Sequence, residues 1–331
     1  MDVYQEAVIE FFKPYPQLSP SSCHQFILDQ IAPAILPFSN LKQADVQPCP
    51  FQGSMSYTAI LSTSSERLVV QFRSSQQDLF GVTEARHIHG DLVPLVSFYG
   101  EYEGLFVYTS SFVEGIPYIH ALMESPDFEF PLVKTMKALH DMADIITRNA
   151  GGNIVPTDPS SLLDGVKSMA DAYPFRKANL RSTVLTCISK LMPLLPDLAA
   201  LPSVLNHQDL GAFNFLIDEP SCHILAVLDW DGALYLPVGS NFHFLEIFFG
   251  HMTPISWRNS EDRDELEASF YARVLSNLAS QGFGQVTEEQ LELQKAIGIL
   301  EYYSKRILQL RDERTERYLE GYLERLSFMR Q

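Results

Sequence analysis

The sequence contains no apolar run of the roughly 18–20 residues that a membrane-spanning helix needs. Its first residues, MDVYQEAVIEFF, lack the basic and apolar segments of a secretory signal. The chain also has no internal repeat and no low-complexity linker. We therefore expect a soluble, cytoplasmic protein.

Cysteine is scarce and scattered. The four cysteines, Cys23, Cys49, Cys187 and Cys222, lie far apart and form no C-x-x-C pair, so the sequence does not support a zinc knuckle. Four cysteines in a chain of 331 residues also do not suggest a disulfide framework. We expect reduced thiols.

Positive charge is in short supply. The chain has 24 Lys and Arg residues against 41 Asp and Glu residues, a formal net charge of −17. This sign repels phosphate backbones, so nucleic acid is not an expected partner. It also opposes ATP at long range, so a nucleotide site would need its own cations or metal. The acidic surface either favours a cationic substrate or serves solubility, and solubility is the simpler explanation.

The rest of the composition is that of an ordinary globular protein, with 46% hydrophobic and 20% charged residues. The length suits a two-lobed enzyme or two modest domains. Residues 1–44 carry short helical patterns broken by prolines and form a predicted helical extension. Residues 45–112 contain short strand-like runs separated by turn residues, with one helical stretch near 79–89.

Helical patterns dominate from about residue 131 onward. Apolar residues recur at helical spacing over 131–148, and segments near 160–171, 177–194, 262–280 and 288–328 are also predicted helices. The exception, 203–230, predicts strand, loop, strand, turn and strand. A small β-rich lobe (45–112) followed by a mainly helical lobe (113–331) with an embedded hairpin predicts an α+β fold, two-lobed and protein-kinase-like.

The candidate catalytic residues lie within that strand-rich exception. His207, Asp209 and Asn214 match the H-x-D-x-x-x-x-N catalytic-loop pattern of kinases. Two apolar runs, at 215–217 and 223–228, flank a turn-forming tetrapeptide and predict a hairpin that ends at Asp229. That hairpin would fold Asp229 back beside Asn214. The alternative is a buried loop-capping Asp, followed by an ordinary turn and strand end.

These residue types suit phosphoryl transfer, which needs positioning and charge neutralisation more than covalent work by the protein. Asp209 would accept or orient the proton of an attacking hydroxyl. The amide oxygen of Asn214 and the carboxylate of Asp229 would bind Mg²⁺, which prefers oxygen ligands and tolerates few from protein. His207 is expected to brace the loop by hydrogen bonding.

The segment LNHQDLGAFNFLID, followed by ILAVLDWDGALYLPVGSNFHFLE, resembles the aminoglycoside phosphotransferase and choline-kinase-like family, in particular its fungal branch. The family pattern H-G-D-x-x-x-x-N with a later D-W fits at His207, Asp209, Asn214, Asp229 and Trp230. The resemblance implies a kinase that transfers the γ-phosphate of ATP to a hydroxyl of a small molecule with the help of Mg²⁺. A nucleotide-binding pseudokinase of the same fold is the alternative.

The resemblance also assigns nucleotide-binding roles within residues 45–112. The turn at Gly53, Ser54 and Ser56 resembles a loop whose backbone N–H groups hold phosphate oxygens, although an ordinary hairpin turn explains the local sequence equally well. Arg73 stands where the family has a phosphate-binding cation, usually lysine. Strand alternation places Gln71 on the same face as Arg73.

Two further contacts follow from the resemblance. Glu84, on the next predicted helix, is the expected ion-pair partner of Arg73, with an unpaired surface Arg and Glu as the alternative. The backbone near Ser110 to Phe112 would bind the purine edge. Such a contact does not distinguish ATP from GTP.

Other polar residues leave their roles open. Gln208 replaces the glycine of the family pattern and would narrow the hydroxyl pocket, and Asp231 would face substrate or support the site. His87 and His89 are expected to be helix-end polar residues, because an i, i+2 pair points to different faces of a helix. The aromatic-rich stretch 235–257 is expected to be helical core. Four acidic residues would either recognise a cation or form a solvated helix face, which is the more common arrangement: Glu246, Glu261, Asp262 and Asp264.

Overall fold

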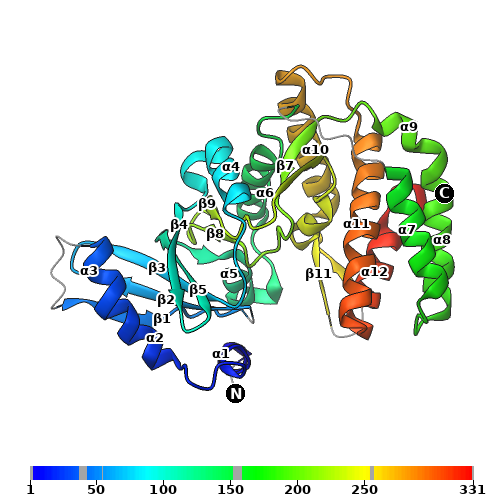
Figure 1. Ribbon diagram of the computed structural model, residues 1–331. Helices are drawn as coiled ribbons and strands as arrows, with labels where there is room; N and C mark the ends of the chain where they lie inside the picture. Colours follow the sequence, from blue (N-terminus) through cyan, green and yellow to red (C-terminus); the bar gives the residue numbers. More distant parts are fainter. Residues whose placement is uncertain (1–2, 37–42, 54, 152–158, 254–256, 330–331) are drawn as a thin grey trace. The chain divides into compact units, whose positions relative to one another are not determined.

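The computed structural model describes residues 3–36, 43–53, 55–151, 159–253 and 257–329. It forms two compact units, Met1–Glu114 (unit 1) and Gly115–Gln331 (unit 2). Figure 1 shows unit 1 in blue to teal and unit 2 in green to red.

Unit 1 is built on a five-stranded antiparallel sheet with the order β1-β2-β3-β5-β4. Its strands are β1 (Asp45–Pro48), β2 (Ser56–Ser62), β3 (Arg67–Arg73), β4 (Val96–Tyr102) and β5 (Leu105–Ser111). The predicted strands are confirmed, and just beyond the first of them the N–H of Cys49 still donates to the carbonyl of Thr58 at 2.9 Å. As the alternation predicts, β3 buries Val70 and Phe72 on one face and leaves Gln71 and Arg73 half-buried on the other.

The N-terminal helices share a hydrophobic core with this sheet (Figure 1). They are α1 (Val3–Phe12), α2 (Pro20–Phe26) and α3 (Ala32–Ile35), with a π-helical turn at Ile27–Ile31. Ser19 caps α2 by accepting the N–H of Ser22, and Pro20 takes a first-turn position where no N–H is needed. The fully buried members of this core are Cys23, Ile27, Ile31, Tyr57, Ala59, Leu61, Val70, Phe72, Leu105 and Val107.

Helix α4 (Leu79–His89) follows β3, as predicted. Asp78 caps it by accepting a 3.0 Å hydrogen bond from the N–H of Phe80. His87 is exposed and His89 is buried. The two rings therefore lie on different sides of the helix, as an i, i+2 spacing requires.

Unit 2 is mainly helical. Its helices are α5 (Tyr118–Glu124), α6 (Leu132–Ile146), α7 (Pro159–Ala172), α8 (Ala178–Leu191), α9 (Leu195–Leu198), α10 (Arg263–Ser280), α11 (Glu288–Leu310) and α12 (Glu313–Arg325). The single helix predicted over 288–328 is wrong, because the chain breaks into α11 and α12. Arg311 ends α11 with a left-handed φ of 51°, and Asp312 caps α12 by accepting the N–H of Thr315 at 2.6 Å.

Short sheets occupy the strand-rich segment of unit 2. β7 (Ser203–Asn206) pairs antiparallel with β10 (Leu234–Pro237), while β8 (Phe215–Ile217) pairs with β6 (Ile116–Pro117) and β9 (Ile224–Val227). The order predicted for 203–230 is confirmed. The helical core predicted over 235–257 is only partly right, because this stretch also holds β10 and the pair β11 (Gly250–Met252) and β12 (Trp257–Asn259). Its helical part is the 3-10 helix η6 (Phe242–Phe248).

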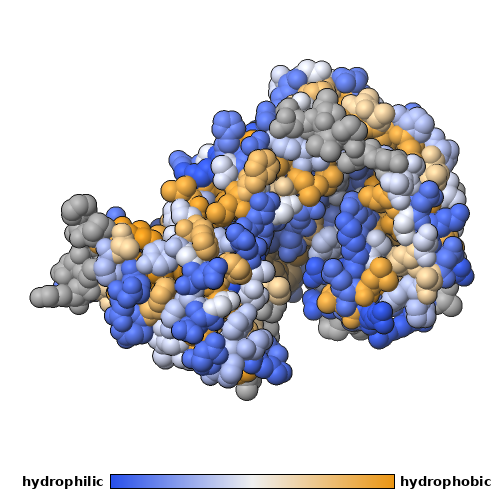
Figure 2. Space-filling model, viewed as in Figure 1, coloured by the Kyte–Doolittle hydropathy of each residue, from blue (hydrophilic) through white to orange (hydrophobic). Residues whose placement is uncertain are grey.

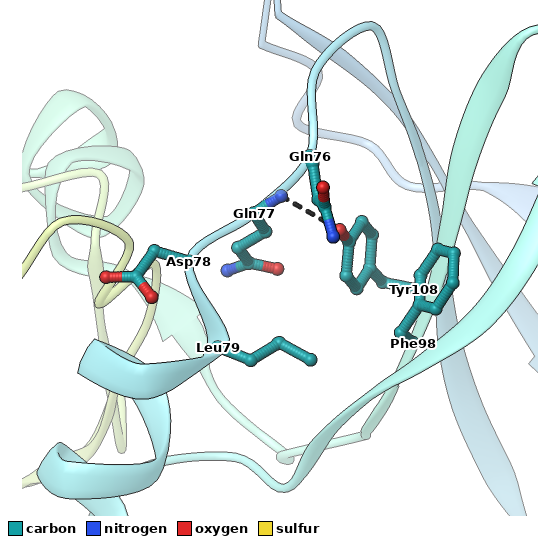
Figure 3. Close-up of a pocket in the computed structure, with 6 residues that line it drawn as sticks. All are labelled: Gln76, Gln77, Asp78, Leu79, Phe98 and Tyr108. Carbon is teal, nitrogen blue, oxygen red and sulfur yellow. Dashed lines mark hydrogen bonds between the residues drawn. The ribbon is translucent and has the colours of Figure 1, made fainter.

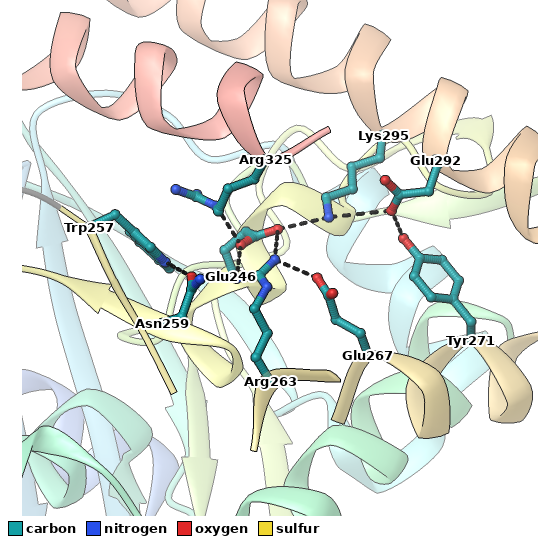
Figure 4. A network of polar contacts seen from close by, with 9 residues as sticks. All are labelled: Glu246, Trp257, Asn259, Arg263, Glu267, Tyr271, Glu292, Lys295 and Arg325. Atoms are coloured by element: carbon teal, nitrogen blue, oxygen red, sulfur yellow. Dashed lines mark hydrogen bonds and ion pairs between the residues drawn. The ribbon is translucent and has the colours of Figure 1, made fainter. Parts of the chain in front are cut away.

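A buried charge network joins η6 to the last three helices of unit 2 (Figure 4). Glu246 of η6 is 1% exposed and pairs with Lys295 of α11 at 2.8 Å, with Arg263 of α10 at 3.2 Å and with Arg325 of α12 at 3.2 Å. Because each cation comes from a different helix, a single carboxylate ties three helices together. The solvated helix face and the cation-recognition site suggested for Glu246 are therefore both wrong.

The helices of unit 2 bury their apolar sides and present polar residues on the surface. Figure 2 shows mainly hydrophilic residues over α11 and α12, with isolated apolar ones between them. None of the helices in the described part of the chain combines the length and apolarity that a membrane span requires.

Candidate active site

The catalytic-loop pattern begins where β7 ends, at His207. The side chain is 2% exposed, and its Nε2–H donates a 2.6 Å hydrogen bond to the carbonyl of Leu228. Its Nδ1 accepts the backbone N–H of Asp209 at 3.1 Å. These two bonds fix the tautomer and join the loop to the segment after β9. The bracing function predicted for His207 therefore matches its contacts.

His207 is held in its neutral form. Burial lowers the pKa of the imidazole, against the opposing effects of the Leu228 carbonyl and the charges of Asp229 and Asp209. The ring also packs edge-on against Trp230 at a centroid distance of 4.9 Å. A neutral, packed imidazole can orient a loop but is poorly placed to exchange protons with substrate.

Asp209 presents its side chain to solvent, two residues after His207. Its surroundings are crowded nonetheless, and burial raises the pKa of the carboxyl, with a further rise from the charge of Asp229. The positive charge of Arg306 acts in the opposite direction. An accessible carboxylate with a raised pKa is more basic than an ordinary Asp, which suits a proton acceptor.

Asn214 ties the loop together from its other end. Its Nδ2 donates a 2.7 Å hydrogen bond to the backbone carbonyl of Asp209, and its own carbonyl accepts the N–H of Leu228 at 2.7 Å. The amide nitrogen is thus committed to the loop, whereas the side-chain oxygen is the atom that a metal could use. The β8–β9 hairpin therefore brings Asn214 beside Asp229, as the sequence predicts.

Asp229 has a strained backbone. Its φ is +57°, in the left-handed region that non-glycine residues rarely adopt. Such conformations cost about 1–3 kcal/mol and concentrate at functional sites. No feature of the sequence predicts this conformation, which Glu103 and Arg311 also adopt.

The donor set fits a hard cation with few protein ligands. Asn214 and Asp229 offer one amide oxygen and one carboxylate, whereas Mg²⁺ keeps several waters and binds one or two carboxylates plus phosphate oxygens. No group of three or more His, Cys, Asp and Glu side chains suited to a metal occurs among the described residues. A zinc-type site of protein ligands alone is therefore not present in that part of the chain.

The turn between β1 and β2 is held by a glutamine that the sequence did not indicate. Gln52 donates to the carbonyls of Cys49 and Thr58 at 2.8 and 2.7 Å, and its Oε1 accepts the N–H of Thr58 at 3.0 Å. Gly53 is exposed beside it. Ser54, the second residue predicted in this turn, lies outside the described residues.

The predicted residues of β2 and β3 do meet. Ser56 lies opposite Arg73 in the strand register. Gln71 joins them, because its Nε2 donates to Ser56 Oγ at 3.0 Å and its Oε1 accepts from Arg73 Nη1 at 3.4 Å. Glu84 is half-buried on α4 in the same unit, and its pairing with Arg73 stays a prediction.

The two residues predicted to bind purine differ in their surroundings. Ser110 lies inside the sheet, opposite Val69 of β3 and Val96 of β4, so both edges of its backbone face neighbouring strands. Phe112 lies just beyond β5, and its ring stacks on the guanidinium of Arg67 at 3.7 Å. The backbone at Phe112 is thus the better candidate for purine contact.

Unit 1 also contains an open cavity of about 480 Å³, shown in Figure 3. It is lined by Gln76, Gln77, Asp78, Leu79, Phe98 and Tyr108, and the N–H of Gln77 donates to the Tyr108 hydroxyl at 2.8 Å. The residues predicted for nucleotide binding do not line this cavity. Its location therefore gives no support to those predictions.

Three residues near the catalytic loop escaped the sequence analysis. Asn241 donates a hydrogen bond from Nδ2 to the backbone carbonyl of His207. Tyr302 and Arg306 of α11 interact electrostatically with Asp209. All three are remote in sequence from the H-x-D-x-x-x-x-N pattern. The hydrogen bond to His207 reveals Asn241, and the packing of α11 reveals the other two.

The sequence leaves open the roles of two residues near the catalytic loop, Gln208 and Asp231. Gln208 is half-buried, and its Nε2 has no hydrogen-bond partner among the described residues. Asp231 is half-buried, two residues after Asp229. Both lie where a substrate contact is reasonable, and their roles stay predictions.

Comparison with known proteins identifies the family and the fold. The model of the Phosphotransferase enzyme family matches residues 53–242, more than half of the chain. No curated protein is similar enough in sequence to match.

Solved structures are similar in fold. Choline kinase from Cryptosporidium parvum aligns with a TM-score of 0.60 at 14% identity, covering 92% of this chain and 95% of that one. Plasmodium vivax ethanolamine kinase aligns with a TM-score of 0.59 at 13% identity, covering 98% and 94%. Aminoglycoside phosphotransferase APH(4)-Ia aligns with a TM-score of 0.55 at 16% identity, covering 94% and 99%. The predicted kinase-like α+β fold is confirmed.

Proposed function

Because the chain belongs to the Phosphotransferase enzyme family, we propose that it transfers the γ-phosphate of ATP to a hydroxyl group of a small molecule. The observation that carries this proposal is the junction of Asp209, Asn214 and Asp229. One hydrogen-bonded loop and one hairpin gather these three side chains, and Asp229 is strained into place.

Asp209 would act on the acceptor. Its carboxylate accepts the hydroxyl proton as the oxygen attacks the γ-phosphorus, and the bond from that phosphorus to the bridging oxygen breaks to release ADP. The neutral His207 holds the Asp209 backbone, while Asn214 holds the carbonyl of the same residue. Proximity and a fixed base then lower the barrier without a covalent enzyme intermediate.

Asn214 and Asp229 would hold Mg²⁺. When bound, the ion would neutralise charge on the phosphate oxygens as the phosphoryl group transfers. A net charge of −17 makes such local neutralisation more important, because the rest of the protein repels the nucleotide.

Unit 1 would supply further contacts to the nucleotide. We assign phosphate contacts to the turn at Gly53, Ser54 and Ser56 and to Arg73, which Glu84 would orient. Arg73 can bind phosphate through two parallel hydrogen bonds, which a lysine cannot. Of the predicted residues Ser110 and Phe112, the backbone at Phe112 would bind the purine of ATP or GTP.

The experiment separates an active kinase from a pseudokinase. Nucleotide binding is measured with and without Mg²⁺, and ADP release is measured with a panel of hydroxylated metabolites. An active enzyme binds Mg-ATP and releases ADP only with an acceptor, and Asp209→Asn loses transfer but keeps binding. Metal-dependent binding without any turnover would indicate the pseudokinase. If neither binding nor turnover occurs, the proposed function is wrong.

A further inference from the structure

One face of α11 lies along the segment that supports the catalytic loop. Gln294, Gly298, Tyr302 and Arg306 recur every four residues and so share this face. Gln294 Nε2 donates a 2.9 Å hydrogen bond to Ser240 Oγ. At Gly298 the helix backbone presses so close that an added Cβ would lie 1.8 Å from the Ser240 carbonyl oxygen.

The docked segment connects directly to the catalytic loop. Asn241, next to Ser240, donates its Nδ2–H to the backbone carbonyl of His207. The position of α11 and the position of the loop are thus fixed against the same short segment. Residues further along the same face of α11 are therefore held at a fixed position relative to the catalytic loop.

Tyr302 and Arg306 are the next residues on this face. The Tyr302 ring packs against His243 and Phe244 at centroid distances of 5.1 and 4.9 Å. Its hydroxyl accepts a 2.6 Å hydrogen bond from Arg306 Nη1, and the guanidinium carbon lies 5.4 Å from the ring centroid. The aromatic cluster therefore fixes Tyr302, and Tyr302 fixes the exposed guanidinium of Arg306.

The contacts of α11 lead from this pair to the catalytic loop, and the electrostatics agree that the pair lies near Asp209. Burial raises the pKa of Tyr302 to about 12, with a contribution from the charge of Asp209. The positive charge of Arg306 in turn acts against burial to lower the pKa of Asp209. Yet no ion pair of 4.0 Å or less joins these two described residues, Arg306 and Asp209. The guanidinium is near the proposed base without being bound to it.

We propose that Arg306, oriented by Tyr302, binds a carboxylate of the acceptor, so that the acceptor is a hydroxy acid whose hydroxyl meets Asp209. This inference rests on the proposed function of Asp209. A guanidinium offers five N–H donors in a planar fork that matches a carboxylate. The hydrogen bond to Tyr302 is the one that Arg306 makes within the described residues, so the remaining donors can meet a ligand.

The alternative of a cationic acceptor rests on the net charge of −17, which acts at long range and is screened by salt. Close to the base lie the carboxylate of Asp229, which we assign to Mg²⁺, and the cation Arg306. The most buried acid of the neighbouring segment, Glu246, is already bound by three cations. With Asp229 engaged by Mg²⁺, the cation Arg306 favours an anionic group at this position.

The test compares hydroxy acids with their amides. Glycolate, 3-hydroxypropionate, 4-hydroxybutyrate, L-homoserine and the amide of each are tested beside choline, by calorimetric binding and by ADP release with Mg-ATP. Variants Arg306→Gln and Tyr302→Phe are compared with Arg314→Gln. Arg314 is a matched control because it is also exposed and lies over a tyrosine ring four residues away, at 5.8 Å from Tyr318.

We expect the carboxylate to bind about tenfold or more tightly than its amide, and Arg306→Gln to remove this preference by raising KM while kcat changes little. Tyr302→Phe should weaken binding less, and Arg314→Gln should change nothing. If acid and amide bind alike, if choline is preferred, or if Arg306→Gln has no effect, the inference is wrong. If carboxylates bind in a way that depends on Arg306 but no phosphate is transferred, the anion site stands and the proposed kinase activity is wrong.

Discussion

The backbone N–H of Leu228 donates a 2.7 Å hydrogen bond to the carbonyl of Asn214. This bond joins the two chains at the open end of the β8–β9 hairpin and sets the next residue, Asp229, beside the end of the catalytic loop. His207 Nε2 reaches the carbonyl of the same Leu228 at 2.6 Å. Leu228 therefore acts as the point where loop and hairpin are fixed to each other, and the proposed metal ligands depend on it.

Replacement of Asp229 by glycine should separate stability from function. Glycine adopts a φ of +57° without strain, so Asp229→Gly should raise the free energy of unfolding by about 1 kcal/mol. The same change removes the proposed carboxylate ligand, so Mg²⁺ should no longer strengthen nucleotide binding. Thermal unfolding and a Mg²⁺ titration of nucleotide binding check the two effects.

Glu103 provides the matched control for this substitution. It is exposed in the turn between β4 and β5 and has a φ of 50°. Glu103→Gly should stabilise the fold by a similar amount and leave metal-dependent binding intact. An unchanged Mg²⁺ titration in Asp229→Gly would contradict the role assigned to Asp229.

Asp209 should set the acidic limb of the activity profile. Burial raises the pKa of this carboxyl above its ordinary value of 3.8, and a general base must be ionised, so kcat should fall as the pH drops through the raised pKa. Asp209→Asn should lower kcat by about 10²–10⁴-fold. A normal pH profile with full activity in this variant would rule out Asp209 as the base.

The same shift predicts the effect of Asp209 on stability. A raised pKa in the folded state means that folding disfavours the ionised form, so Asp209 destabilises the protein at neutral pH. This destabilisation disappears as the pH falls below the ordinary pKa of the unfolded chain. Asp209→Asn should therefore unfold at a slightly higher temperature than the unmodified protein at pH 7, and the difference should vanish in acid.

The sequence predicts the parts of this site that depend on local pattern. The order of strands, the hairpin and the juxtaposition of Asn214 and Asp229 follow from apolar runs and a turn-forming tetrapeptide. The break at Arg311 does not, because a left-handed residue other than glycine or asparagine has no clear sequence signal. Gln52 and Arg306 also escape prediction, because their partners are set by tertiary packing or by side-chain geometry.

Gly298 should be intolerant of even one methyl group. A Cβ there would lie 1.8 Å from the backbone oxygen of Ser240, which cannot rotate away as a side chain can. Gly298→Ala should therefore displace α11 and lower the free energy of unfolding by about 1–3 kcal/mol or more. Because the same segment supports His207 through Asn241, nucleotide-dependent turnover should fall as well.

Gly165 is the control for Gly298. It lies in α7 with no heavy atom within 4 Å of an added Cβ. Gly165→Ala should stabilise the protein by roughly 0.5–1 kcal/mol, because alanine is the better helix former. Chemical denaturation of both variants tests this. Equal effects at the two positions would show that α11 does not depend on close contact with Ser240.

Neutralising the buried Glu246 should destabilise unit 2 far more than neutralising the exposed Glu261. Although burial acts to raise the pKa of Glu246, the charges of Lys295, Arg325 and Arg263 hold it well below its ordinary value. Glu246→Gln would leave these buried cations without their shared anion, at a cost of roughly 3–5 kcal/mol in the free energy of unfolding. The control is exposed Glu261, whose replacement by glutamine should change the free energy of unfolding by less than about 0.5 kcal/mol.

The contribution of Glu246 should also depend on pH. Since the folded pKa is depressed, this contribution is complete above the pKa of the unfolded chain and is lost as the pH falls toward the folded value. The stability gap between the unmodified protein and Glu246→Gln, measured by urea denaturation, should therefore be constant near neutral pH and narrow in acid. A gap that widened in acid would mean that the network does not depend on the charge of Glu246.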